Sequence, residues 1–418
     1  MLAGLVLAAP ALLVTVDSAL AYARGWRFSS RFDLSGALAA AAWLLVVAVA
    51  CLVPASRRRL AVKLPQLLAL SLSVCAGWLA SELALGPLLE RIDNPYLSRP
   101  GLTRVYRPLP GMMRDVGPES HVRTNSWGMR GSDPPPRETA YRILCLGGST
   151  TACTYLDDTK TWPALVESRM QSSASTEKPA RFWVGNAGLP GLRSMENLRF
   201  LQQSQRVNEV DCVVVQTGVN DLISCLAGLR PAPPLWIRSH VWRMAHVIIR
   251  SSIESGTLVE DAAGDVYRRR RAIRQAAAIS DDAPPLEPCL QNFADNIQAI
   301  IEVCRQHHVR AVFTTQPVLW RADLDAQNES LLWFGQLADG RFLSARMLRA
   351  AADQYNDTLR NVCASEGIGL IDLDELNGDP TAFYDDCHFT ETGARRVAQL
   401  VAEWLLEHPD DARSGAES

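Results

Sequence analysis

The sequence lacks the cysteine and histidine spacing that structural metal sites use. Its ten cysteines include no CxxC pair, and eight of them are widely scattered beyond residue 140. Scattered thiols in a large domain are usually small buried hydrophobes, and an even count leaves one or two disulfides open. We therefore expect no metal and no cofactor, while the cysteines leave the cellular compartment undecided.

The chain also lacks a surplus of basic residues. Its 42 lysines and arginines are offset by 45 aspartates and glutamates, so the formal net charge is −3. A nucleic-acid partner would require a basic surface, and none is expected here. The lysine of a Walker-type phosphate loop is likewise absent after Gly147-Gly148-Ser149, which disfavours nucleotide binding. The oligomeric state is left open.

Long uncharged runs are confined to the first ninety residues. The candidate membrane spans are Leu2–Ala23, Gly36–Val53 and Leu64–Leu89. A helix needs about 20 apolar residues to cross a bilayer, so residues 1–90 are expected to form an anchor of about three spans. Asp17 interrupts the first span and Glu82 lies in the third. A cleaved signal peptide is the alternative for the first span, because Ala21-Tyr22-Ala23 resembles a small-residue cleavage site.

Arginines near the spans indicate an orientation, although they do not all agree. The short loop between the second and third spans carries Arg57, Arg58, Arg59 and Lys63. The positive-inside tendency puts this loop in the cytoplasm, and three spans then place everything after residue 90 on the outer face. The arginines that favour the reverse are Arg24, Arg27, Arg31, Arg91, Arg99, Arg104 and Arg107. We expect an integral membrane protein whose catalytic domain lies on the outer, periplasmic or extracellular, face.

From residue 141 the sequence alternates short apolar runs with helical patterns. The expected strands are Arg142–Leu146, Arg181–Val184, Asp211–Gln216, Val309–Thr315 and Ile368–Leu373. The expected helices are Trp162–Met170, Phe293–His307, Ala345–Ser365 and Glu391–Glu407. This alternation predicts a parallel sheet covered by helices on both faces, hence a three-layer α/β/α domain over residues 141–408.

Three segments fall outside this pattern. They are a linker over 91–140 that packs on the domain, an insertion over 222–288 and a polar, disordered tail over 409–418. The insertion contains an amphipathic stretch, Leu235–Ile253, that includes Trp236 and Trp242. A lid over the active site, a helix on the membrane surface and a plain packing helix all remain open for it. The Arg268–Arg271 run is interpreted as a solvated face.

Small and polar residues follow three of the expected strands. Ser149 follows the first after two glycines, Gly188 follows the second and Asn220 follows the third. Because ligands bind outside the carboxyl ends of the strands in open α/β sheets, these loops should converge. Ser149 would present its hydroxyl at the start of a helix, although an N-capping serine is the ordinary alternative. The Gly188 N–H and the Asn220 amide are donors suited to a developing oxyanion.

A base for this hydroxyl is offered by Tyr384–Thr390, just before the last expected helix. His388 is one of only seven histidines, and imidazole titrates in the range that general-base catalysis needs. Asp385 lies three residues earlier, so a local turn can bring its carboxylate to the ring and fix the tautomer. The pattern predicts a serine, histidine and aspartate that act together.

These four blocks, in this order, resemble those of the SGNH hydrolases, the GDSL-like esterase family. The matching blocks are Gly147-Gly148-Ser149-Thr150, Gly188, Gly218-Val219-Asn220-Asp221 and Asp385–His388. The segment Thr124–Gly131 also looks like one that precedes the first strand in many membrane-linked members. The resemblance covers roughly residues 120–407, from the segment before the first strand to the end of the closing helix.

The resemblance implies a flavodoxin-like α/β/α fold and a role for each matched residue. Ser149 is then the nucleophile, His388 the base and Asp385 the residue that orients the histidine. The N–H groups of Ser149 and Gly188 and the Asn220 side chain would line the oxyanion hole. Gly148 stands where the family usually has an aspartate, which leaves the subfamily open. The long insertion also departs from the family and weakens any inference about substrate.

The expected activity is cleavage of an acyl ester through a serine acyl-enzyme. A membrane tether keeps an enzyme beside glycans and lipids, and small polar residues around Ser149 favour an acetyl or similarly short acyl group on a saccharide. A lipid stays open, because Trp236 and Trp242 could line an apolar trough. The alternatives are an O-acyltransferase that uses the same triad and a catalytically silent, SGNH-like glycan-binding module.

Overall fold

The computed structural model describes residues 2–23, 31–54, 62–92, 96–173, 181–228, 234–253 and 257–409. The chain forms two compact units. The helical unit comprises Met1–Asn94 and Leu229–Ser255, and the α/β unit comprises Pro95–Gly228 and Gly256–Ser418. The arginines at positions 24, 27 and 57–59, and the tail beyond residue 409, lie outside the described residues.

The helical unit contains three N-terminal helices and a segment from the insertion. Its elements are α1 (Leu2–Ala23), α2 (Arg31–Leu52), α4 (Leu64–Ile92), the 3-10 turn η4 (Leu235–Arg238) and α9 (His240–Ile253). In the described part of the chain, one stretch, Asp33–Ala50 in α2, is long and apolar enough to cross a membrane. Shorter apolar stretches, Ala11–Tyr22 and Leu72–Gly86, lie in α1 and α4. Of the three spans expected from the sequence, α2 alone meets this measure.

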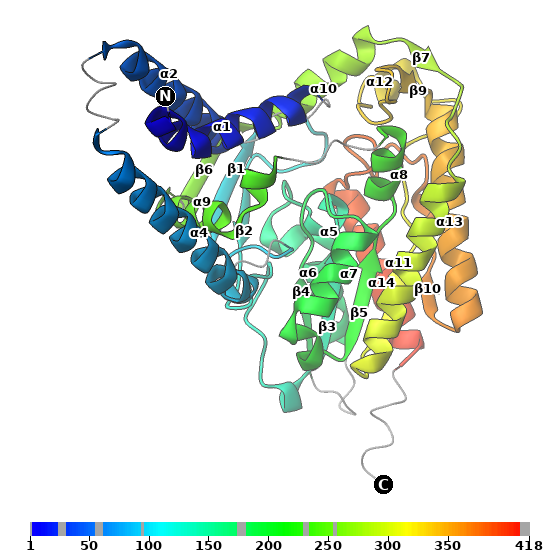
Figure 1. Ribbon diagram of the computed structural model, residues 1–418. Coiled ribbons are helices and arrows are strands. Elements are labelled where there is room, and N and C mark those ends of the chain that lie inside the picture. The colour runs from blue at the N-terminus through cyan, green and yellow to red at the C-terminus, as the bar shows by residue number, and fades with distance from the viewer. Residues whose placement is uncertain are drawn as a thin grey trace. The chain divides into compact units, whose positions relative to one another are not determined.

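A five-stranded parallel sheet organises the α/β unit (Figure 1). Its strands are β3 (Tyr141–Gly147), β4 (Phe182–Asn186), β5 (Cys212–Gln216), β8 (Arg310–Thr314) and β10 (Gly369–Ile371). The spatial order β10-β8-β5-β3-β4 is the flavodoxin-like order, in which the winding reverses between β3 and β5. The predicted strands agree with these bounds to within two residues, because the strands are buried apolar runs.

Helices cover both faces of this sheet, which confirms the predicted three-layer fold (Figure 1). On one side α6 (Trp162–Ser173) packs against α14 (Glu391–Glu407). The second group comprises α7 (Ser194–Gln203), α8 (Val219–Leu226), α11 (Glu287–Gln306) and α13 (Ala345–Glu366). The closing helix α14 has the predicted bounds, because the Thr390 side chain accepts from the Gly393 N–H and sets the first turn.

The expected linker and insertion are more regular than their sequences indicate. The linker contains β1 (Thr103–Pro108), β2 (Ser120–Arg123) and the 3-10 turn η1 (Arg137–Thr139). The end of the insertion supplies β6 (Thr257–Ala263), α10 (Asp265–Ala276) and β7 (Ile279–Ser280). Strand β6 pairs in parallel with β1, so the insertion completes a sheet that the linker begins. Tertiary pairing, which periodicity does not report, orders these segments.

The remaining short elements join these parts of the α/β unit. They are α5 (Ser149–Ala152), α12 (Ala326–Glu329), β9 (Phe342–Leu343), which pairs with β7, and the 3-10 turns η2 (Asp158–Lys160), η3 (Gln205–Glu209) and η5 (Asp374–Leu376). The interpretation of Arg268–Arg271 as a solvated face holds for the exposed Arg268, Arg269 and Arg270 but not for Arg271. Arg271 is buried and donates to the carbonyls of Met112, Leu331 and Tyr384, so it is not part of a solvated face.

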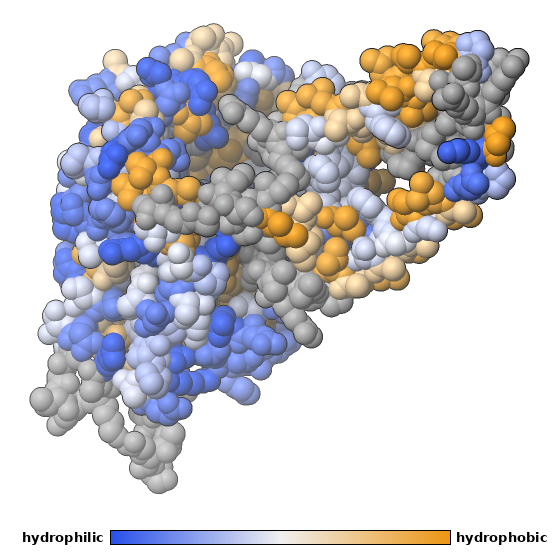
Figure 2. Space-filling model, turned by 90° about the vertical axis from the view of Figure 1, so that its left-hand side faces the viewer, coloured by the Kyte–Doolittle hydropathy of each residue, from blue (hydrophilic) through white to orange (hydrophobic). Residues whose placement is uncertain are grey.

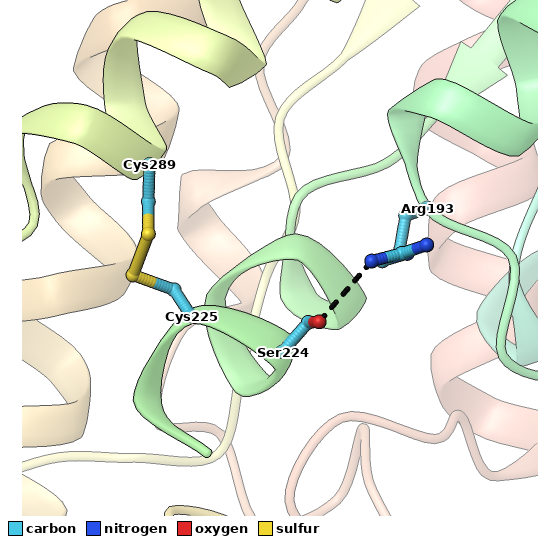
Figure 3. Close-up of a disulfide and its surroundings, with 4 residues drawn as sticks. All are labelled: Arg193, Ser224, Cys225 and Cys289. Carbon is cyan, nitrogen blue, oxygen red and sulfur yellow. Dashed lines mark hydrogen bonds between the residues drawn. A yellow bond between two sulfur atoms is a disulfide. The ribbon is translucent and has the colours of Figure 1, made fainter. Parts of the chain in front are cut away.

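A disulfide joins the two ends of the insertion. It joins Cys225 near the end of α8 to Cys289 in the first turn of α11, 64 residues later (Figure 3). The neighbouring Ser224 accepts a hydrogen bond from Arg193, which precedes α7. The helix that carries Asn220 is therefore fixed to two neighbouring elements of the α/β unit.

Candidate active site

Ser149 is the first residue of α5, which begins two residues after the last residue of β3. Gly148 is the N-cap residue of this helix, and an N–H in the first helical turn has no acceptor inside the helix. Ser149 is partly exposed, whereas Thr150 and Thr151 are buried. The fold thus presents one hydroxyl, with its own N–H beside it, at the carboxyl edge of the sheet next to the topological switch.

His388 and Asp385 extend from this hydroxyl as a hydrogen-bonded chain. The Nε2 atom of His388 lies 2.7 Å from Ser149 Oγ, and its Nδ1 atom lies 2.7 Å from Asp385 Oδ2. A carboxylate only accepts hydrogen bonds, so Nδ1 carries the proton and Nε2 faces the hydroxyl as an acceptor. The structure brings together the three side chains that the sequence singled out.

The Asp385 carboxylate is fully buried yet well supplied with donors. It accepts from the backbone N–H groups of His388 and Cys387 and from the Trp333 indole at 3.0 Å. Burial alone raises the pKa of a carboxyl, but the His388 charge and these hydrogen bonds outweigh it and hold the pKa of Asp385 below its usual value. Asp385 is therefore ionised at neutral pH and fixes the ring.

The adjacent Asp386 faces away from the imidazole. It accepts from the Trp320 indole at 2.7 Å and from the backbone N–H of Trp333 at 2.8 Å. Burial and the neighbouring Asp385 charge raise the pKa of Asp386 to about 6. Its hydrogen bonds tie the 331–334 segment to the histidine loop, so its position is that of a structural carboxylate.

Backbone carbonyls of the histidine loop are held by two arginines. Arg114 donates to the Phe383 carbonyl at 2.7 Å and Arg271 to the Tyr384 carbonyl at 3.0 Å. The Leu319 N–H donates to the Asp386 carbonyl. Because these donors come from the linker, the insertion and the loop after β8, distant parts of the α/β unit fix the imidazole.

Asn220 lies beside the nucleophile loop. Its Nδ2 atom donates to the Leu192 carbonyl at 2.9 Å, and an amide has a second N–H that remains for another acceptor. A Cβ at Gly148 would lie 2.4 Å from this Nδ2 atom. Glycine at position 148 therefore leaves room for the Asn220 amide.

Gly188 approaches α5 through its backbone. A Cβ at this position would lie 2.3 Å from the Ala152 nitrogen, so only glycine permits the contact. The Gly188 N–H donates to Asn186 Oδ1 at 2.9 Å. The structure brings Gly188 to the nucleophile helix, but its N–H is engaged by Asn186 and does not point to Ser149 as an unshared donor.

The carbonyl end of α5 is held by side chains from other elements. The Thr150 carbonyl accepts from the Trp162 indole and the Thr151 carbonyl from the Asn186 amide. Arg130 donates to the carbonyls of Ala152 and Cys153 at 2.8 and 2.9 Å. The last carbonyls of a helix lack internal donors, so these three side chains fix a helix of only four residues.

Arg130 comes from the Thr124–Gly131 segment and is itself buried. Its Nε atom donates to Asp158 at 2.7 Å, and its Nη2 atom donates to the carbonyls of His121 and Leu156. The preceding turn needs Gly128 at φ +80°, where a Cβ would meet the Ser98 carbonyl at 2.1 Å. Through Arg130, this segment thus holds the carbonyl end of α5 in place, a role that the sequence resemblance did not specify.

We expect Arg130→Lys to lower kcat by about tenfold or more with little change in KM, because a small misplacement of a reacting group is costly. Lysine keeps the charge beside Asp158 but loses the forked donation to α5. Arg123→Lys is the matched control, since Arg123 pairs with the same carboxylate at 2.9 Å from its exposed side. Steady-state kinetics with thermal melts check this, and equal kcat values for both variants would contradict it.

Aromatic rings surround His388. Tyr384 and Trp333 lie nearly parallel to the imidazole, with ring centroids 5.6 and 6.4 Å away, and Tyr267 lies at 6.0 Å. Tyr155 packs on Tyr267 at 5.9 Å. Tyr267 comes from α10 of the insertion, so the insertion contributes a buried ring that packs beside the imidazole.

One group among the described residues has ligand types that a metal could use, namely Asp385, Cys387 and His388. The first and third of these are already paired through Nδ1. Burial raises the pKa of the Cys387 thiol well above its usual value, so the thiol stays protonated and is a poor ligand. This group fits a catalytic hydrogen-bond chain better than a metal site.

Several residues of this site were not found by sequence reasoning. Asn186 lies within a glycine-rich strand end, which was a usable signal. Trp333 and Arg271 lie far in sequence from His388 and carry no local signal, because only the tertiary fold brings them near.

Comparison with known proteins identifies the family. The model of the GDSL-like lipase/acylhydrolase family matches residues 145–396. Among curated proteins, none matches the sequence. An acetylxylan esterase from Geobacillus stearothermophilus, solved as a catalytic mutant, is 11% identical over 64% of this chain and 93% of its own, with a TM-score of 0.36. A lipase/acylhydrolase from Enterococcus faecalis is 16% identical over 63% and 94%, also with a TM-score of 0.36.

The family assignment rests on the family model, which spans more than half of the chain. The matched region contains β4, β5, β8 and β10, the end of β3, and both residues of the Ser149–His388 contact. The chain therefore belongs to the GDSL-like lipase/acylhydrolase family and is an enzyme that hydrolyses ester bonds.

Proposed function

We propose that the protein is a serine esterase that removes acetyl or similarly short acyl groups from a saccharide of the cell envelope. The observation that carries this proposal is the 2.7 Å contact between His388 Nε2 and Ser149 Oγ. A nucleophile within reach of a base that a third group orients is the arrangement that covalent acyl transfer needs.

The chemistry follows from the direction of these hydrogen bonds. Ser149 Oγ attacks the ester carbonyl carbon while His388 Nε2 takes its proton, and Asp385 stabilises the imidazolium. The protonated His388 then gives the proton to the leaving alcohol, which leaves an acyl-enzyme. Water, deprotonated by the same nitrogen, attacks the acyl carbon, and Ser149 recovers its proton as the acid departs.

The developing oxyanion needs donors beside Ser149. We assign this role to the Ser149 N–H, which starts α5, and to the second N–H of the Asn220 amide. The Gly188 N–H can join them only by sharing its hydrogen bond with Asn186. Gly188 otherwise contributes by letting its loop lie against α5.

The surroundings of the triad support a saccharide rather than a long acyl chain. The groups next to Ser149 are small or polar, namely Gly148, Thr150, Gly188 and Asn220. Of the rings around His388, Tyr267 and Tyr384 are buried, so the half-buried Trp333 ring offers the surface that a sugar can contact. A long acyl chain would instead require an apolar trough of large side chains.

A series of p-nitrophenyl esters tests the acyl preference. We expect the highest kcat/KM with acetate and a fall as the chain lengthens, because the groups next to Ser149 are small or polar. An acetylated oligosaccharide, with free oligosaccharide as competing acceptor, tests the acceptor in parallel. Activity that rises toward long chains would contradict the short-acyl proposal, and acyl transfer to the free oligosaccharide would show a transferase.

We further propose that the chain is anchored in a membrane with its α/β unit on the outer face. The apolar stretch Asp33–Ala50 in α2 supports the anchor, and the Cys225–Cys289 disulfide supports an oxidising compartment. A reporter fused after Ser418 should behave as exported, whereas one inserted at residues 55–63 should behave as cytoplasmic. A cytoplasmic C-terminal reporter would reverse the orientation and leave the chemistry unaffected.

A further inference from the structure

The apolar helices of the helical unit contain three carboxylates. Asp17 lies in α1, Asp33 in the first turn of α2 and Glu82 in the second half of α4. A charged side chain inside an apolar helix costs free energy unless it finds a partner, and in membranes it marks a functional contact. The partners of these three groups are therefore informative.

All three carboxylates bind one short segment of the insertion. Asp17 accepts from the Leu235 N–H at 2.6 Å, and the neighbouring Ser18 hydroxyl accepts from the Trp236 indole at 3.0 Å. Asp33, which is buried, accepts from the Trp242 indole at 2.8 Å. Because residues 235–242 reach all three helices, the three carboxylates lie at the same end of the helical unit.

Glu82 caps the helix that follows this segment. It accepts from the backbone N–H groups of His240 and Val241 at 2.8 and 3.2 Å, in the first turn of α9. First-turn N–H groups lack internal acceptors, and a carboxylate there also favours the helix dipole. The N-terminal helices thus supply the cap of a helix that lies some 160 residues later in the chain.

Two glycines shape the N-terminal helices to fit the same segment. A Cβ at Gly36 of α2 would lie 2.4 Å from the Trp242 ring and 3.2 Å from the Trp236 ring. A Cβ at Gly86 of α4 would lie 3.0 Å from the His240 ring. The two tryptophans also pack edge to face, with centroids 4.7 Å apart. The close packing and the hydrogen bonds involve the same residues, so the contact between the N-terminal helices and residues 235–242 is specific.

The surface of the joined elements is apolar. Leu235 is 69% exposed and Ile248 of α9 is 56% exposed. Exposed apolar residues of the N-terminal helices include Leu12, Leu13, Leu38, Leu45, Leu72, Leu79 and Leu83. Figure 2 shows hydrophobic residues gathered on one part of the face in view, whereas the remainder is mainly hydrophilic. Apolar surface on this scale marks a contact with a membrane or another protein.

We propose that residues 235–253 form a fourth element of the membrane anchor, which lies in the interface of the bilayer. Indole rings favour the headgroup level, and the carboxylates bind the segment there. This inference rests on the proposed membrane anchoring. Its consequence is that the chain passes between the two units three times, near residues 94, 228 and 255, so the anchor is more than an N-terminal tether.

Cysteine accessibility in the full-length protein tests this inference. Leu235→Cys and Ile248→Cys would be made in a Cys75→Ser background, since Cys75 is an exposed free thiol. The protein would be reconstituted in phosphatidylcholine vesicles and treated with a water-soluble maleimide. Ile279→Cys is the matched control, because Ile279 is 48% exposed and belongs to the α/β unit. Leu79→Cys in α4, where Leu79 is 62% exposed, reports on the anchor.

We expect the 235 and 248 thiols to react about tenfold or more slowly than the 279 thiol, because the bilayer interface shields them. Glu82→Gln should raise the reactivity at 248, while hydrolysis of a soluble aryl acetate stays unchanged. If positions 235 and 248 react as fast as 279 while 79 is shielded, the inference is wrong and the anchor stands. Reactivity at 79 as well would overturn the anchor. Loss of esterase activity in Glu82→Gln would show that the segment acts on catalysis and would also overturn the inference.

Discussion

Replacing Ser149 with alanine should lower kcat for an aryl acetate by about 10⁴-fold or more, the loss typical of a triad nucleophile. The reason is that no other hydroxyl in the described part of the chain lies within hydrogen-bond reach of His388 Nε2. Since His388 is the one hydrogen-bond partner of the Ser149 hydroxyl among the described residues, the thermal melt should change little. Steady-state kinetics and a thermal melt on the same preparation provide the measurement.

Ser168→Ala is the control for this substitution, because Ser168 is an exposed serine on α6. It should keep full activity and the same melting temperature. Retention of a tenth of the activity by Ser149→Ala would show that another group forms the acyl-enzyme. A large fall in melting temperature would instead mean that the loss of activity reports on folding.

Asp385→Asn should lower kcat by about 10²-fold or more, since an asparagine amide no longer selects the tautomer in which Nδ1 carries the proton. The neighbouring Asp386→Asn should keep most of kcat, because Asp386 binds the Trp320 and Trp333 N–H groups and not the imidazole. Its effect should appear as a lower melting temperature, from a buried hydrogen-bond network that loses an acceptor.

These two variants can be compared directly because the two aspartates are adjacent in sequence and both are fully buried. Differences in burial therefore do not account for a difference in kcat. Equal losses of kcat, or a larger loss for Asp386→Asn, would refute the proposed pairing of Asp385 with His388. The pair of measurements needs only the kinetic and melting assays that serve for Ser149.

The sheet was predictable because each of its strands is a short run of apolar residues. The run at 212–216, for example, is buried throughout, and its ends are marked by Asp211 and the polar Thr217. Helix α7 was missed because its sequence is mostly polar and its buried positions, such as Phe200 and Leu201, are few. Strand β6 was missed because this segment becomes a strand only by pairing with β1, which lies about 150 residues earlier in the chain.

The approach of Ser149, Asp385 and His388 was predictable from strand ends and from a three-residue spacing. The support around them was not, because it depends on contacts that are remote in sequence. Arg130 reaches α5 only because a turn at Gly128 directs it there, and Trp333 reaches Asp385 from 52 residues away. Gly188 lies where it was expected, yet Asn186 takes its N–H, a local competition that spacing does not reveal.

The most direct test of the central claim is labelling with a serine-reactive phosphonate, followed by mass spectrometry of the modified peptide. The account predicts one adduct, on Ser149, that is absent from Ser149→Ala and forms more slowly in Asp385→Asn. Wild-type labelling at another serine, or no labelling of a protein that hydrolyses aryl acetate, would contradict it.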